Sequence, residues 1–288
     1  MKIKALLLAA AVCVAVIAGG CSQSDSNKND SSSKASVSSE TSDSSKEDSK
    51  KDDNSNKENS AQDSKDSSDK ESSVPTGEAV DAAWFNDALF IGDSVTLKLS
   101  SYADTGDLGD AQFLCAGSLG YTNALWDIDH EDNVHPMYEG QQYTVDEGAK
   151  LIAPKKIFVM LGMNDIGLYG VDGAIESMKE LTGKIKNNCP DSVIYIESVT
   201  PMIAGYSLGD LNNTSIAEFD EKLKTVCAEN GFKYMDVASA VSDENGDLIY
   251  EYCSDIPTDD NPNGMGLHFT EEGCKAWADY LKANVNNA

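Results

Sequence analysis

The stretch Phe90-Ile91-Gly92-Asp93-Ser94-Val95-Thr96 joins an apolar run that ends at Ile91 to a helical pattern that starts at Ser94. A buried strand that passes through a glycine directly into a helix is typical of the β-α units of a parallel sheet. Gly92 permits a tight turn, and Ser94 then lies at a helix N-terminus, where backbone N–H groups and the helix dipole favour negative charge. This position suits a nucleophile of acyl transfer, although Asp93 and Ser94 are also common as simple helix caps.

The alternation of short apolar runs and helical patterns continues along the chain. Buried strands are predicted at 88–91, 112–115, 156–161, 193–199 and 232–237. Helices are predicted at 94–102, 145–152, 171–188, 215–230 and 270–284. Strands rich in Ile, Val and Phe that alternate with helices indicate a parallel sheet covered on both faces, so the predicted fold is a three-layer α/β/α domain. In such a fold the ligand site lies beyond the carboxyl ends of the strands.

Three further blocks lie next to predicted elements. In Cys115-Ala116-Gly117-Ser118-Leu119-Gly120, after the second strand, the backbone N–H of Gly120, or failing it of Gly117, can donate to an oxyanion. Asn164 follows the third long strand, and its side-chain amide is a suitable second donor. His268 precedes the last helix and is the natural general base, because imidazole titrates near neutrality. Each block also has a purely structural interpretation, as a turn or as a packed histidine.

Together the four blocks resemble the SGNH, or GDSL-type, hydrolase superfamily. The resemblance covers about residues 83–281 and rests on Gly92-Asp93-Ser94, a glycine after the second strand, Gly162-x-Asn164-Asp165 and a late His. It implies a flavodoxin-like sheet and a serine ester hydrolase that needs no cofactor and no metal. The resemblance makes Ser94 the nucleophile and His268 the general base. It places the N–H groups of Ser94 and Gly120 and the side chain of Asn164 in the oxyanion hole.

One position departs from this family pattern. Met265 stands three residues before His268, where the family usually has an Asp that holds the imidazole in the required tautomer. We therefore expect a Ser–His dyad, or a substitute acceptor from Asp259, Asp260 or a backbone carbonyl near Met265. If the position is vacant, Met265→Asp should raise kcat.

The first 74 residues have a different character. Lys2 and Lys4 precede an apolar run at 5–18 that is too short to span a bilayer comfortably and has the plan of a secretory signal. The run leads to Ala18-Gly19-Gly20-Cys21, which resembles the lipobox of bacterial lipoproteins; an ordinary signal with an incidental Cys is the alternative. Residues 22–74 contain 20 Ser and only four aliphatic side chains, which predicts a disordered tether.

The predicted organisation is therefore a lipoprotein signal at 1–21 that ends at a lipidated Cys21, a tether at 22–74 and a hydrolase domain at 75–288. We expect the lipid to anchor the protein to the outer face of the cytoplasmic membrane, at a Gram-positive-like cell surface, as its only contact with the membrane.

The charge narrows the range of partners. The chain has 22 Lys+Arg against 49 Asp+Glu, a net charge of -27, and residues 75–288 alone carry 12 Lys and 36 acids. Such a surface repels polyanions, so we expect no nucleic-acid partner and a neutral ester as substrate. O-acetyl groups on carbohydrate are the first candidate, and lipid or lysophospholipid esters are the second. A non-catalytic glycan-binding protein is the alternative outside catalysis: Met265 favours it, and the joint presence of Ser94, Asn164 and His268 opposes it.

Two other features leave questions open. Acidic and histidine side chains cluster between Trp126 and Met137, but their spacing matches neither a zinc helix nor a calcium loop, so a solvated acidic loop is predicted. Cys253 and Cys274 flank His268, and a disulfide between them is conceivable in an exported protein.

Overall fold

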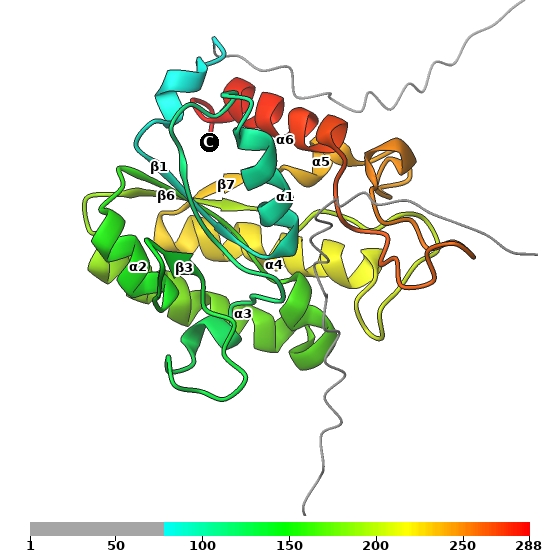
Figure 1. Cartoon of the computed structure of the whole chain (residues 1–288), viewed down its shortest axis with the longest axis horizontal. Coiled ribbons are helices and arrows are strands. Elements are labelled where there is room, and N and C mark those ends of the chain that lie inside the picture. Colours follow the sequence, from blue (N-terminus) through cyan, green and yellow to red (C-terminus); the bar gives the residue numbers. More distant parts are fainter. Residues whose placement is uncertain (1–77) are drawn as a thin grey trace, which may run out of the picture. The chain divides into compact units, whose positions relative to one another are not determined.

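The computed structural model describes residues 78–288, and their centre is a five-stranded parallel sheet (Figure 1). The strands lie in the order β2-β1-β5-β6-β7, and every neighbouring pair is parallel. Their bounds are β1 Ala88–Gly92, β2 Gln112–Cys115, β5 Lys156–Met160, β6 Val193–Glu197 and β7 Lys233–Met235. Counted along the chain, this is the flavodoxin-like order 2-1-3-4-5. The predicted sheet is confirmed.

Helices cover both faces of the sheet, as the sequence predicts. Figure 1 shows α1, α5 and α6 on one side and α2, α3 and α4 on the other. Their bounds are α1 Ser94–Ala103, α2 Val145–Ile152, α3 Met163–Asn188, α4 Asn213–Asn230, α5 Ala238–Val241 and α6 Glu271–Asn284. Short 3-10 turns complete the fold at η1 Ala82–Phe85, η2 Asn123–Leu125 and η3 Tyr250–Tyr252. None of the helices between residues 78 and 288 is both long enough and apolar enough to cross a membrane.

A row of aromatic side chains crosses the middle of the sheet. Phe113, Phe90, Phe158 and Tyr195 occupy paired register positions on four neighbouring strands. Their rings are stacked, with centroids 5.1, 4.7 and 4.6 Å apart along the row. Phe158 at its centre is completely buried. Because cross-strand aromatic pairs stabilise a sheet beyond the area that they bury, this row fixes the register of the strands.

The predicted helix at 171–188 begins earlier in the structure. Helix α3 starts at Met163, and its first turns are separated from the rest by Gly170, whose φ is 70°. The predicted helix is the part of α3 after Gly170, and the prediction missed the helical turns before it. Glycines at 162, 167 and 170 break the helical pattern there, whereas Met163 and Ile166 are buried and hold these turns against the core. This early start places Asn164 on a helix rather than in a loop.

The acidic segment at 126–137 is held together by its own histidines. His130 stacks on Trp126 with ring centroids 4.1 Å apart, and the buried His135 bonds to the Trp126 carbonyl through Nε2 at 2.9 Å. A small hairpin of β3 (Met137–Tyr138) and β4 (Gln141–Gln142) then leads to α2. Both histidines therefore have structural contacts within this segment.

The topology fixes where a site can form. Strands β2 and β5 leave the first strand, β1, on opposite sides, so the order reverses at β1. Ligands of open α/β sheets bind at such a switch point, beyond the carboxyl ends of the strands. Ser94 and Asn164 follow the ends of β1 and β5 within a few residues, so both lie at this edge.

Candidate active site

The turn after β1 presents Ser94 at the first position of α1. Asp93 is the N-cap of this helix, and its Oδ1 accepts the backbone N–H of Val95 at 2.9 Å. Asp93 is thus the capping residue, which leaves the Ser94 hydroxyl free for another contact. The N–H of Ser94 is among the first N–H groups of a helix, which have no partner within the helix.

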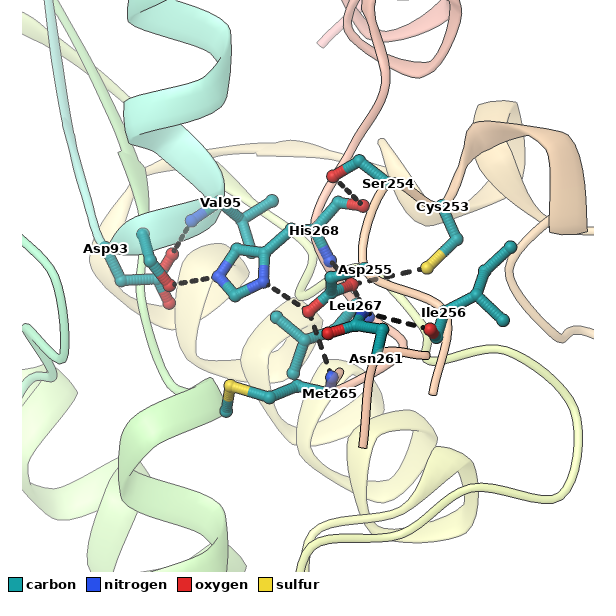
Figure 2. A network of polar contacts seen from close by, with 11 residues as sticks. Asp93, Val95, Cys253, Ser254, Asp255, Ile256, Asn261, Met265, Leu267 and His268 are labelled. Atoms are coloured by element: carbon teal, nitrogen blue, oxygen red, sulfur yellow. Dashed lines mark hydrogen bonds and ion pairs between the residues drawn. The ribbon is translucent and has the colours of Figure 1, made fainter. Parts of the chain in front are cut away.

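The Ser94 hydroxyl contacts the only histidine near the last helix. His268 Nε2 lies 2.9 Å from Ser94 Oγ, and His268 Nδ1 lies 2.7 Å from Oδ2 of Asp255. Figure 2 shows the imidazole between the turn that begins at Asp93 and the Asp255 carboxylate. An imidazole that bonds a hydroxyl through one nitrogen and a carboxylate through the other is the arrangement that activates a serine for nucleophilic attack.

Asp255 is held in a cradle of donors. Its Oδ1 accepts the backbone N–H groups of Leu267 at 3.0 Å and His268 at 2.9 Å, and its Oδ2 accepts that of Met265 at 3.1 Å. The Cys253 thiol also donates to Oδ1, at 3.3 Å. Partial burial acts to raise the pKa of Asp255, but the bonds from His268 and from the backbone outweigh it and hold this pKa well below its ordinary value. Asp255 therefore stays ionised beside the imidazole.

This contact corrects the expectation of a Ser–His dyad. A carboxylate does face Nδ1 of His268, but it comes from Asp255, neither from Asp259 or Asp260 nor from a backbone carbonyl. The loop folds back so that the backbone before His268 wraps around a side chain thirteen residues earlier. Met265 occupies the family's acidic position and contributes only its backbone N–H to this network.

The expected oxyanion donors gather at the same edge, yet two of them already have partners. The Asn164 amide donates to Leu119 O at 3.0 Å and to Asp93 Oδ2 at 3.3 Å. The Gly120 N–H donates to Asn123 Oδ1 at 2.8 Å. Among residues 78–288, no acceptor is found for the N–H of Ser94, nor for that of Gly117, the alternative donor.

A buried carboxylate explains why a glycine stands at position 120. Asp165 accepts the N–H groups of Tyr121 and Thr122, both at 2.8 Å, and a Cβ atom at Gly120 would come within 2.6 Å of its Oδ2. Burial raises the pKa of Asp165, and the Thr122 and Tyr121 donors lower it. Asp165 and Asn123 together fix three consecutive N–H groups of the loop after β2.

Asp93 is a buried carboxyl at the centre of the site. It is completely buried, and burial raises its pKa to about 6, against the opposing effects of the Val95 N–H and of His268. Asp93 lies next to Ser94 and also contacts Asn164. Asp93 therefore connects the N-terminus of α1, which carries the Ser94 hydroxyl, to the side-chain amide of Asn164.

Sequence reasoning missed Asp255, Asp165 and Asn123. For Asp165 a signal existed, since it is the last residue of the Gly162-x-Asn164-Asp165 block. For Asp255 the signal was weak, because this residue lies thirteen residues before His268 and only the fold brings its carboxylate to the imidazole. The two cysteines that flank His268 are not bonded to each other, because all five cysteines of the described residues are free.

The comparisons with known proteins agree with this geometry. The family model for the GDSL-like lipase/acylhydrolase family matches residues 90–276. The chain belongs to this family. Because its members are ester hydrolases, this GDSL-like chain is an ester hydrolase, as the sequence analysis predicts.

Solved structures show the same fold for this GDSL-like hydrolase. A protein of Streptococcus pneumoniae, provisionally described as a platelet activating factor, is 18% identical, with a TM-score of 0.51 over 70% of this chain and 89% of that one. An acylhydrolase of Bacteroides fragilis, also provisionally described, is 15% identical, with a TM-score of 0.50 over 69% of this chain and 86% of that one. A search of the curated proteins finds no match.

Proposed function

We propose that this GDSL-like hydrolase cleaves its ester through an acyl-enzyme on Ser94, with His268 as general base and Asp255 as the group that orients the imidazole. The observation that carries the proposal is the continuous chain of contacts from Ser94 Oγ through both nitrogens of His268 to Asp255 Oδ2, at 2.9 and 2.7 Å. The two distances are within hydrogen-bond reach, which a nucleophile, its base and the group that orients that base require.

In the acylation step, Ser94 Oγ attacks the ester carbonyl carbon while His268 Nε2 takes the hydroxyl proton. The carbonyl oxygen becomes an oxyanion, and the unpaired N–H at the start of α1 is suited to stabilise it. The Asn164 amide is suited to do so once it exchanges Leu119 O for the oxyanion. The tetrahedral intermediate then collapses: the C–O bond to the alcohol breaks, and His268 gives its proton to the departing oxygen.

Deacylation repeats these steps with water. His268 Nε2 takes a proton from water, the hydroxide attacks the acyl carbon, and the carboxylic acid leaves as Ser94 recovers its proton. In both halves the imidazole becomes positively charged, and the ionised Asp255 stabilises that charge through Nδ1.

A neutral ester is the substrate class that the charge supports. Residues 75–288 carry 12 Lys against 36 acids, so a polyanionic substrate would be repelled. We propose O-acetylated carbohydrate first. Exposed apolar side chains of Met265 and Tyr206 favour a lipid-like ester as the second candidate. The non-catalytic reading loses support, since a protein that only binds has no physical need for a carboxylate held on the imidazole.

The remaining expectations concern the location and are proposals too. We propose that Cys21 carries a lipid, that residues 22–74 tether the hydrolase, which starts near residue 75, and that the protein acts outside the cell. Residues 1–77 lie outside the described part of the structure. The support for these proposals is the charge, apolar and serine-rich pattern of the sequence alone.

The test is hydrolysis of p-nitrophenyl acetate by the full chain and by its Ser94→Ala variant at pH 7 to 8. The proposal predicts turnover by the wild type that is lost in the variant. If both proteins are equally inactive on this and on longer acyl esters, the proposed function is wrong. Circular dichroism of the variant serves as the control for folding.

A further inference from the structure

We propose that Met265 determines which alcohol the hydrolase accepts, by giving the leaving group an apolar contact. The inference rests on the proposed acyl-enzyme function and adds the recognition of one half of the ester. Met265 stands where the family usually has the acid of the catalytic set. Because Asp255 supplies the carboxylate that orients His268, the side chain at position 265 is not needed for that role.

The chemistry decides which half of the ester lies near His268. The imidazole must give its proton to the departing oxygen, so that oxygen has to come within hydrogen-bond reach of Nε2. The carbonyl oxygen points instead toward the start of α1, where N–H groups are available. The alcohol therefore extends past the histidine loop, whereas the acyl group remains on Ser94.

Met265 is tied to the imidazole through its backbone. Its N–H and His268 Nδ1 both bond to Oδ2 of Asp255, at 3.1 and 2.7 Å, so residue 265 lies close to the ring. Its side chain makes no contribution to that network and is 36% exposed. In Figure 2 it points away from Asp255 and toward the side of the view on which Asp93 lies.

A second exposed apolar side chain accompanies Met265. A Cβ atom at Gly266 would meet Ile203 at 2.9 Å and Tyr206 at 3.6 Å, which shows how closely the segment around residue 205 approaches the histidine loop. The Ile203 N–H donates to Gly266 O at 2.9 Å, and the Tyr206 hydroxyl donates to Pro257 O at 3.2 Å. Tyr206 is thereby fixed with 38% of its surface exposed. In a domain that is otherwise strongly acidic, this pair favours an uncharged, apolar alcohol. Of the two proposed substrates, it therefore favours the lipid-like ester, the second candidate, over O-acetylated carbohydrate.

The test varies the two halves of the ester separately. One series keeps the acetyl group and lengthens the alcohol, from ethyl to butyl acetate; the other keeps ethanol and lengthens the acid, from ethyl acetate to ethyl butyrate. All acetates form the same acetyl-enzyme, so an alcohol contact changes kcat/KM, which reports acylation. The proteins are the full chain, Met265→Ser, Met265→Leu and, as matched control, Leu151→Ser. Leu151 is 54% exposed and lies near the end of α2, which leads to the opposite, amino-terminal edge of the sheet.

We expect Met265→Ser to lower the butyl-over-ethyl acetate preference about 4-fold, the effect of losing one buried methylene, ~0.8 kcal/mol. The acid series should stay unchanged, Met265→Leu should keep the wild-type preference, and Leu151→Ser should alter neither series. A change confined to the acid series, or equal preferences in wild type and Met265→Ser, would overturn the inference while leaving the proposed hydrolysis intact. If the wild type hydrolyses p-nitrophenyl acetate but none of these alkyl esters, the apolar alcohol contact is overturned and the proposed hydrolysis stands. If it hydrolyses no ester at all, the proposed function fails and the inference fails with it.

Discussion

Replacing Asp255 by Asn is the substitution that most directly probes the carboxylate of the site. Asn has nearly the same shape as Asp but only one acceptor oxygen, and its NH₂ group is a donor. The two oxygens of Asp255 accept three backbone N–H groups and the His268 ring. Whichever way the amide is turned, its NH₂ group faces donors: either the N–H groups of Leu267 and His268, or the imidazole and the N–H of Met265.

The magnitude follows from these contacts. If the amide oxygen stays on the backbone donors, the NH₂ group faces Nδ1 and forces the imidazole into the tautomer that cannot accept the proton of Ser94. If it turns over, two buried N–H groups lose their acceptor, at ~1–3 kcal/mol each. In both cases the positive charge of the imidazole loses its counter-charge. We expect kcat/KM to fall about 10³-fold, with most of the loss in kcat, because the interaction is realised in the transition state.

The assay is steady-state hydrolysis of p-nitrophenyl acetate by the full chain, wild type against Asp255→Asn. Asp259→Asn is the control, because it alters a carboxylate of the same loop that does not contact His268. Circular dichroism and a thermal melt separate lost chemistry from lost folding. A folded Asp255→Asn variant within 10-fold of wild type would refute the assigned role, as would an equal loss in Asp259→Asn.

Three further predictions follow from other contacts. Met265→Asp should not raise kcat, because Nδ1 of His268 is already bonded to Asp255 and only the backbone of residue 265 reaches that carboxylate. Steady-state rates of the wild type and the variant decide this, and a higher kcat in Met265→Asp would contradict the assigned role of Asp255. Phe158→Ala removes the centre of the aromatic row and should lower the free energy of unfolding by ~3–5 kcal/mol, measured by urea titration; a loss below 1 kcal/mol would contradict the packing described. Burial raises the pKa of Glu197 from 4.5 to about 8, so the folded protein holds a proton that the unfolded chain releases. The contribution of Glu197 to the free energy of unfolding should therefore fall by ~2 kcal/mol between pH 5 and pH 7, in addition to the contributions of other buried carboxyls such as Asp220. Glu197→Gln, which keeps the shape, should lose that part of the pH dependence, and an unchanged slope would rule out the buried carboxyl as its source.

The architecture could be predicted from sequence because its signals are local. Each strand is a short run of Ile, Val and Phe between turns, and helical spacing follows it, so five strands and five helices emerge in the correct order. The helical turns of α3 before Gly170 could not be predicted, because the burial of Met163 and Ile166 outweighs the glycines around them. Tertiary contacts override local propensity at such positions.

The site was partly predictable for the same reason. Ser94, Asn164 and His268 each lie beside an element boundary, and parallel strands bring such boundaries to one edge. The role of Asp255 was not predictable, because its carboxylate reaches His268 only when the loop between them folds back around it. Likewise, no local pattern reveals that the side-chain oxygen of Asn123 accepts a hydrogen bond from the N–H of Gly120.

The central claim is that Ser94 carries the acyl group during turnover. The full chain would be mixed with p-nitrophenyl acetate, quenched in acid within the first turnovers and digested for peptide mass spectrometry. We predict an acetyl group on the peptide that contains Ser94, found in the wild type and missing from Ser94→Ala. Acetylation at a different residue only, or wild-type turnover by Ser94→Ala, would contradict the account.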